Sequence, residues 1–236
     1  ACVPVHGTRA YMSQPHAQNI IPLIEAQEYI SKAYWHPTHL GIRHDLMTRK
    51  FWHTQGKNLQ DHYSHVLRLP RAHQEGAWLT VPDKNEVAEV VIARSARYHG
   101  RFPWKRVWRA VKSKAVFIGT KAEHQDFVKE VGDVPHYETK TLLDVAKVIA
   151  GCRLFVGNQS CPRAIAEGLK VPVVVETGAP NDTMFDRPDA WYSNGKLDFW
   201  CEALGAYERD KQEHLTVSAR PTVRHAVLCG PRNRRR

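Results

Sequence analysis

Cysteine is scarce in this chain of 236 residues. The five cysteines are odd in number and widely spaced, and no CxxC pair occurs, so neither a disulfide scaffold nor a zinc ribbon is predicted. Long apolar runs are also missing, and none approaches the ~20 residues that cross a bilayer. The first residues lack the basic and apolar segments of a signal peptide. These absences, with 42% hydrophobic residues, predict a soluble globular protein of the cytoplasm with reduced thiols.

Acidic residues are absent from two windows of the sequence. Residues 94–114 hold eight Lys and Arg, and residues 220–236 hold six Arg, with no Asp or Glu in either window. The formal net charge of +10 therefore comes from two local segments on an otherwise mildly acidic chain. Such segments favour a polyanionic partner, namely a nucleotide diphosphate, a nucleic acid or an anionic lipid headgroup. The alternative is a solvated basic face and a tail without fixed structure.

Aromatic residues are interspersed among the inner basic residues. They would let planar groups stack beside the cations, as nucleic-acid-binding proteins do. The four aromatic residues are Tyr98, Phe102, Trp104 and Trp108.

Short apolar runs alternate with amphipathic stretches in the second half of the chain. The predicted strands cover 86–94, 115–118, 154–157 and 171–176. The predicted helices cover 103–114, 123–131, 141–150 and a segment from an N-cap at Ser160 to Glu167. This alternation predicts an α/β fold with a Rossmann-like parallel sheet and helices on both faces.

The first half of the chain is less regular. A helix is predicted over 19–30, with Pro22 in its first turn, and a strand is predicted over 77–81. A boundary near residue 83 follows from the Pro82-Asp83-Lys84 linker. The predicted division is a partial α/β acceptor-side region at 1–82, a Rossmann-like nucleotide-binding domain at 83–206 and a basic tail at 207–236.

The carboxyl ends of the predicted strands identify the candidate site, because ligands of open parallel sheets bind there. Two arginines, a lysine, hydroxyl groups and the start of a helix would together hold a phosphate or diphosphate. Glu176 would accept hydrogen bonds from ribose hydroxyls. The candidate residues are Arg94, Ser95, Arg97, Gly119, Thr120, Lys121, Gly157, Asn158, Gln159, Ser160, Arg163 and Glu176. The alternative for the segment after 157 is an ordinary turn in which Gly157 and Ser160 serve only the backbone.

Three other chemistries, at a metal site, a serine nucleophile and a reactive cysteine, lack the residue patterns that they need. A metal or acid–base interpretation is suggested by His36, His39 and His44 and by the Asp61–His65 segment. Because the sequence on either side of them is irregular, no metal site is predicted. The Gly157–Cys161 run lacks the second glycine of a hydrolase nucleophile elbow. Cys161 at a helix start would have a depressed pKa, but no histidine is positioned beside it.

The sequence Val156-Gly-Asn-Gln-Ser-Cys-Pro-Arg-Ala, followed by the strand from Val171, resembles a known motif. It is similar to the "val-gly-asn-asp-thr-gly-pro-x-his" run that precedes a "pro-val-val" strand in GT-B glycosyltransferases, in particular ADP-heptose:lipopolysaccharide heptosyltransferases. The resemblance extends from about Val90 to Glu176, the C-terminal nucleotide-sugar-binding domain of that family. The Leu23–Ile30 stretch also resembles part of the family's N-terminal domain.

This chain departs from the family motif at four positions. Ser160 replaces its threonine, and its aspartate, glycine and histidine are replaced by Gln159, Cys161 and Ala164. The resemblance implies a metal-independent glycosyltransferase with no cofactor, in which a nucleotide-sugar is the donor substrate. Arg97 and Lys121 would neutralise the leaving diphosphate. The donor, the acceptor, the catalytic base and the stereochemical course stay unassigned.

Two other functions remain open at the level of the sequence. The first is a non-catalytic or nucleic-acid-associated protein on the same fold, binding through 94–114 and 220–236. The second is an assembly subunit whose shortened first domain is completed by a partner chain. A glycosyltransferase with a polyanionic acceptor, such as modified DNA or lipopolysaccharide, would combine the transferase interpretation with the first of these alternatives.

Overall fold

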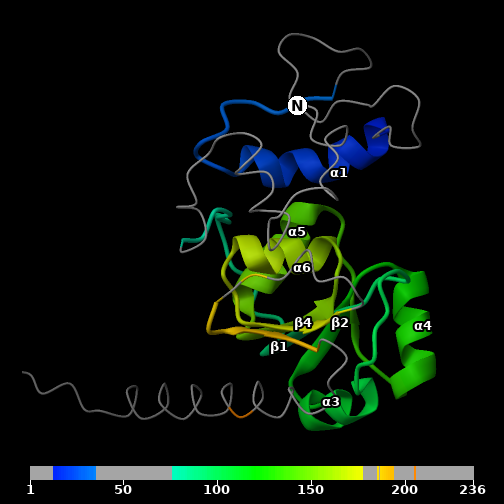
Figure 1. The fold of residues 1–236 in the computed structure, drawn as a ribbon. Coiled ribbons are helices and arrows are strands. Elements are labelled where there is room, and N and C mark those ends of the chain that lie inside the picture. Colours follow the sequence, from blue (N-terminus) through cyan, green and yellow to red (C-terminus); the bar gives the residue numbers. More distant parts are fainter. Residues whose placement is uncertain (1–12, 36–75, 178–184, 186, 194–204, 206–236) are drawn as a thin grey trace, which may run out of the picture.

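A six-stranded parallel sheet organises the computed structural model, which describes residues 13–35, 76–177, 185, 187–193 and 205 (Figure 1). The strands lie in the order β3-β2-β1-β4-β5-β6, which is the strand order of a Rossmann fold. The predicted α/β fold class is confirmed. The strands are β1 (Val90–Ala93), β2 (Ala115–Ile118), β3 (His136–Tyr137), β4 (Leu154–Asn158), β5 (Val173–Glu176) and β6 (Ala190–Tyr192).

Helices cover both faces of this sheet. They are α1 (Gln14–Glu25), α3 (Trp104–Val111), α4 (Lys121–Val131), α5 (Leu142–Gly151) and α6 (Cys161–Gly168). α5 and α6 lie on one face, with α1 packed outside α5, and α3 and α4 lie on the other (Figure 1). The four central strands are buried on both sides. This double burial explains why their sequences are continuous apolar runs rather than alternating ones.

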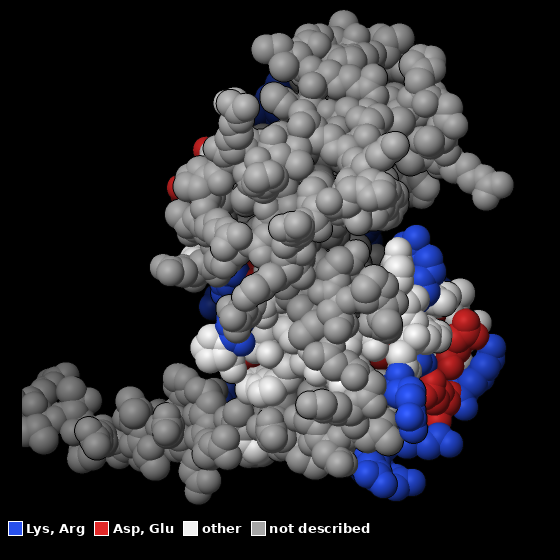
Figure 2. All heavy atoms as spheres, in the orientation of Figure 1, with Lys and Arg blue, Asp and Glu red and all other residues white. Residues whose placement is uncertain are grey.

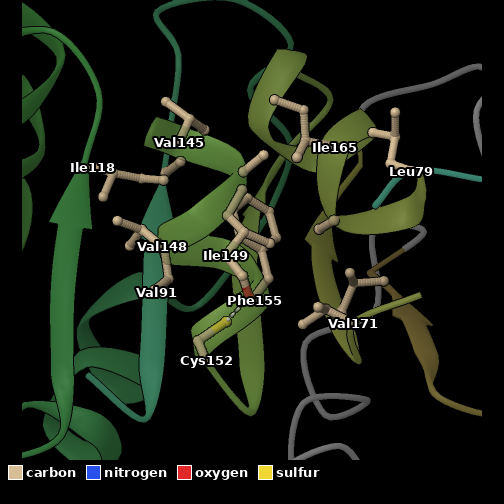
Figure 3. Packing of buried hydrophobic residues seen from close by; sticks show 14 of the residues in the cluster. Leu79, Val91, Ile118, Val145, Val148, Ile149, Cys152, Phe155, Ile165 and Val171 are labelled. Atoms are coloured by element: carbon tan, nitrogen blue, oxygen red, sulfur yellow. Dashed lines mark hydrogen bonds between the residues drawn. The ribbon is translucent and has the colours of Figure 1, made fainter. Parts of the chain in front are cut away.

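Alternate residues of each strand enter opposite halves of the core. Val91 of β1 and Phe155 of β4 pack with Val148 and Ile149 of α5 (Figure 3). Their neighbours in the strands face the other way, toward an aromatic cluster with α3 and α4. In that cluster Trp104 is 1% exposed, and its ring meets Phe127 edge-on at 5.0 Å.

Local sequence explains where the helices begin. Thr120 and Thr141 each accept a hydrogen bond from the third residue of their helix, whose carboxylate bonds back to the threonine N–H. These capping boxes satisfy amide groups that a helix start leaves open. The helices predicted over 123–131 and 141–150 are confirmed within two residues.

The N-terminal helix differs from the prediction. It runs over Gln14–Glu25 rather than 19–30, because Pro15 occupies its first turn after the N-cap residue Ser13. Pro22 consequently lies inside the helix, where it has no N–H to donate to the preceding turn. Leu23 still joins the core beside Leu79.

The strand predicted over 77–81 is absent. The amides of Trp78 and Leu79 both donate to the carbonyl of Gly168 at the end of α6, at 2.9 Å each. Gln27, which is 3% exposed, adds bonds to the backbone of Thr80. Residues 78–80 therefore bond to the end of α6 and to Gln27, just after α1, instead of joining the sheet.

Several features of the sequence lie outside the described residues. They include the histidine-rich stretch at 36–75, the basic tail at 207–236 and Cys2, Cys201 and Cys229. The boundary near residue 83 stays a prediction. Among the described residues, no helix is long and apolar enough to cross a membrane.

Candidate functional site

The loop that follows β1 sits where the strand order reverses. β1 lies between β2 and β4, so residues 94–100 emerge at the topological switch point of the sheet. Because all six strands are parallel, the ends of β2, β4 and β5 open at the same edge. The fold therefore brings the predicted strand-end residues to one edge, as expected from the sequence.

Asn158 holds this loop from the end of β4. Its side chain is completely buried, and its Oδ1 accepts from the amide of Ser95 at 3.0 Å. Its Nδ2 donates to the carbonyl oxygens of Ser95 at 2.9 Å and Arg97 at 2.6 Å. The side-chain amide of Asn158 thus pairs with three backbone groups of the loop, namely the N–H and C=O of Ser95 and the C=O of Arg97. This role needs a side chain that both donates and accepts, as an amide does.

Glu176 holds the same loop from the end of β5. Its carboxylate is completely buried and accepts from Arg94 Nε at 2.8 Å and Nη2 at 2.9 Å. It also accepts from the amide of Gly100 and from Trp104 Nε1, each at 3.0 Å. Four donors fill the lone-pair directions of the carboxylate. The predicted bonds from Glu176 to a ribose would have to replace one of these.

Arg94 forms ion pairs with two carboxylates. Besides Glu176, its guanidinium pairs with Glu130 of α4, and its centre lies 5.4 Å from the centroid of the Trp104 ring. Burial lowers the pKa of Arg94, but the hydrogen bonds and charges of Glu176 and Glu130 outweigh that effect and raise it above its ordinary value. Arg94 is therefore a permanently charged anchor between β1, β5 and α4.

Arg97 and Ser95 also belong to the candidate site, but their side chains form fewer and weaker bonds than that of Arg94. Arg97 is exposed and forms no ion pair with a described residue. The hydroxyl of Ser95 lies 3.4 Å from both the Arg97 carbonyl and Asn158 Oδ1, which is long for a hydrogen bond. Neither side chain is held by a short hydrogen bond or by an ion pair with a described residue.

The start of α6 borders the loop. Ser160 occupies the N-cap position, as predicted, but its hydroxyl donates to the Asn158 carbonyl at 3.2 Å instead of capping the helix. The first turn of α6 receives no side-chain cap, and because Pro162 has no N–H, the amides of Cys161 and Arg163 are the ones suited to an anion. Gln159 is half-buried beside them.

Gly157 has a packing role in this structure. A Cβ at this position would lie 2.5 Å from the carbonyl oxygen of Ala93 in the paired strand and 2.7 Å from the Phe155 ring. Only a glycine allows β1 and β4 to approach this closely.

The candidates after β2 lie on the other side of β1 and bond elsewhere. Lys121 reaches Glu138 at 3.1 Å in an exposed pair, and Thr120 caps α4. Gly119 has a φ of 141°, a backbone conformation that residues with a side chain rarely adopt. Its carbonyl oxygen lies 3.0 Å from Nε2 of His136.

Arg163 points into the fold from α6. It is 4% exposed, donates to the Tyr192 hydroxyl at 3.0 Å and lies 4.8 Å from the centroid of the Phe185 ring. Its cation is therefore stabilised by aromatic rings of the β6 region.

Two interpretations based on the sequence need correction. Of the four aromatic residues proposed to stack planar groups, Phe102, Trp104 and Trp108 are buried in the core, and only Tyr98 is exposed, at 55%. The predicted depression of the Cys161 pKa is also wrong, because desolvation of the thiol raises it.

The described part of the chain holds few clustered metal ligands. No group of three or more His, Cys, Asp and Glu residues there could hold a metal ion. His36, His39, His44 and the Asp61–His65 segment lie outside the described residues.

Comparison with known proteins gave structural matches alone. No family model and no curated protein matches the sequence. The structure is similar to glycosyltransferases. One is the glycosyl transferase family 9 protein of Veillonella parvula DSM 2008, with a TM-score of 0.44 and 17% identity over 73% of this chain and 54% of that one. Another is the dodecameric iron-containing heptosyltransferase TibC in complex with ADP-D-beta-D-heptose, with a TM-score of 0.39 and 15% identity over 59% of this chain and 50% of that one. This chain spans about half the length of each.

Proposed function

We propose that this chain binds a nucleotide-sugar at the carboxyl edge of its sheet and transfers the sugar to an acceptor. The observation that carries the proposal is the loop at 94–100. It is fixed at the switch point by two completely buried side chains, Asn158 and Glu176, and it presents the exposed cation of Arg97. Rossmann-like sheets bind nucleotides at this place.

The diphosphate is the part of the donor that the edge suits best. Arg97 supplies an exposed positive charge, and the start of α6 supplies N–H groups without a side-chain cap. Lys121, whose side chain is 75% exposed, would add a second cation from the end of β2 by exchanging its exposed pair with Glu138 for the diphosphate. These groups would stabilise the charge that develops on the leaving nucleoside diphosphate without a metal ion or cofactor.

The transfer itself is a substitution at the sugar. An acceptor hydroxyl oxygen bonds to the anomeric carbon, and the bond from that carbon to the diphosphate oxygen breaks with its electron pair. The hydroxyl proton passes to a base, for which no residue is assigned. The sequence resemblance to the heptosyltransferase family supports this reaction class.

Calorimetric titration tests the binding step. The ligands are ADP, GDP, UDP, CDP and their common sugar conjugates, and the variants are Arg97→Ala and Arg109→Ala. Loss of one charge-assisted contact weakens binding about 10- to 150-fold, so Arg97→Ala should show this loss. Arg109→Ala, an exposed arginine of α3, should bind as wild type. The proposal is wrong if no ligand binds or if Arg97→Ala is indistinguishable from wild type.

A second candidate function rests on the outer face of α3. Five exposed cations lie on or beside this helix, and none forms an ion pair with a described residue. Figure 2 shows Lys and Arg side chains gathered in the region of α3 and α4, with acidic side chains among them. The five residues are Arg101, Lys105, Arg106, Arg109 and Lys112. We propose this face as a docking surface for nucleic acid, either as an acceptor or in a non-catalytic role.

Salt dependence measures that interaction. Five phosphate contacts predict that affinity falls about 500-fold between 50 and 200 mM salt. A gel-shift assay with the triple variant Lys105→Ser, Arg109→Ser, Lys112→Ser should lose most of this slope. Lys129→Ser, an exposed lysine paired with Asp126, is the matched control. A salt-insensitive shift, or equal binding by the triple variant, would exclude the surface.

Association with a second chain is the remaining proposal. Light scattering at several concentrations tests it. A mass above 27.0 kDa that includes a second chain supports it, whereas a 27.0 kDa monomer that binds nucleotide argues against it.

A further inference from the structure

Tyr98 has an unusual backbone conformation. Its φ is 60°, in the left-handed region that is a true outlier for a bulky residue. Lys170, with φ 56°, is the other such non-glycine residue among those described, and it directly follows the end of α6, where left-handed residues commonly terminate helices. Tyr98 ends no helix, so its conformation has a different cause.

Contacts on both sides of Tyr98 impose this conformation. Before it, the carbonyl of Arg97 accepts the 2.6 Å bond from the buried amide of Asn158. After it, the amide of Gly100 donates to the buried carboxylate of Glu176 at 3.0 Å. The imidazole of His99 also contacts the Ser95 carbonyl at 2.9 Å, which closes the loop on itself. The ends of β4 and β5 therefore determine the backbone at residue 98.

Burial of the Tyr98 ring does not offset the strain of its backbone. The side chain is 55% exposed, whereas Phe102, Trp104 and Trp108 of the same basic window are buried. An aromatic ring held in solvent by a strained backbone is typical of a binding residue rather than a core residue. The Arg97 guanidinium lies 5.5 Å from the ring centroid, so the cation and the ring are presented together.

We propose that Tyr98 is the platform on which the planar base of the nucleotide stacks. This inference rests on the proposed nucleotide site and adds a role that separates base recognition from diphosphate recognition. Arg97 binds the diphosphate charge, and the neighbouring ring binds the base through its face, which every nucleobase can use. Tyr98 is thereby a determinant of affinity for nucleotides over inorganic anions.

The test compares two kinds of ligand in calorimetric titrations. ADP, GDP, UDP and CDP carry a base, and inorganic pyrophosphate does not. Tyr98→Asn removes the ring and keeps a residue that tolerates the left-handed conformation, so the loop is preserved. We expect nucleoside diphosphate binding to weaken about 5- to 150-fold, the range measured for loss of base stacking. Pyrophosphate binding should be unchanged, and Tyr98→Phe should bind as wild type.

Tyr34→Asn is the matched control. Tyr34 is 61% exposed and has the Lys32 ammonium 5.9 Å from its ring centroid, but it lies on the segment after α1. It should not affect any ligand. Wild-type affinity of Tyr98→Asn for nucleotides would overturn the stacking role and leave the proposed function standing. Equal weakening for pyrophosphate and nucleotides would also overturn it, because the effect would then come from the loop. Absence of all binding to wild type would overturn both proposals.

Discussion

Replacing Glu176 by glutamine separates its structural role from the ribose-binding role that the sequence predicts. Glutamine keeps the size of the side chain but removes the charge and turns one acceptor into a donor. In the structure that donor would face N–H groups of Arg94, Trp104 or Gly100. The substitution therefore breaks an ion pair whose carboxylate is completely buried.

The loss of unfolding free energy in Glu176→Gln depends on the surroundings of Arg94. Removing one partner of a buried ion pair costs about 3–5 kcal/mol. Arg94 is 11% exposed and keeps its second partner, Glu130, so the lower end of the range applies. We expect Glu176→Gln to lower the free energy of unfolding by about 3 kcal/mol, which corresponds to a fall in Tm of about 6–12 °C.

Urea unfolding followed by circular dichroism measures this change. Glu130→Gln is the control, because its side chain is 39% exposed and removing a partly exposed charge costs no more than about 1 kcal/mol. A Glu176→Gln variant within about 1 kcal/mol of wild type would refute the structural role. If that variant also lost nucleotide affinity, Glu176 would be the ribose ligand instead.

Three further results are expected. Gly157→Ala should lower the free energy of unfolding by about 1–3 kcal/mol in urea melts, because its Cβ would lie 2.5 Å from the Ala93 carbonyl oxygen. Gly76→Ala meets no atom within 4 Å and should be neutral, and equal effects of the two would contradict the close approach of the strands. Burial raises the pKa of Cys152 from 9.0 to about 12, so its contribution to stability is complete below pH 9 and is lost as the pH rises toward 12. Wild type should therefore lose stability over this range relative to Cys152→Ala, and parallel pH profiles would contradict it. Since the pKa of Cys161 is also raised, iodoacetamide should modify it more slowly than free cysteine at pH 8, as mass spectrometry would show.

Sequence patterns predicted the sheet well where local signals are strong. The apolar runs at 115–118 and 154–157 form strands because both faces of the sheet are covered, which leaves no room for polar residues. Thr120 and Thr141 mark helix starts through their own hydrogen bonds. β3 and β6 were missed, since strands of two and three half-buried residues carry too little pattern.

By itself the sequence determined the fold class and the set of residues that the strand ends bring to one edge. Both depend on periodicity and chain order, which a linear pattern records. Tertiary structure decided what each of these residues does. The pairing of Arg94 with Glu176, separated by 82 positions, and the inward direction of Arg163 depend on contacts between distant segments. The left-handed backbone of Tyr98 has the same origin, because it is imposed by side chains from two other strands.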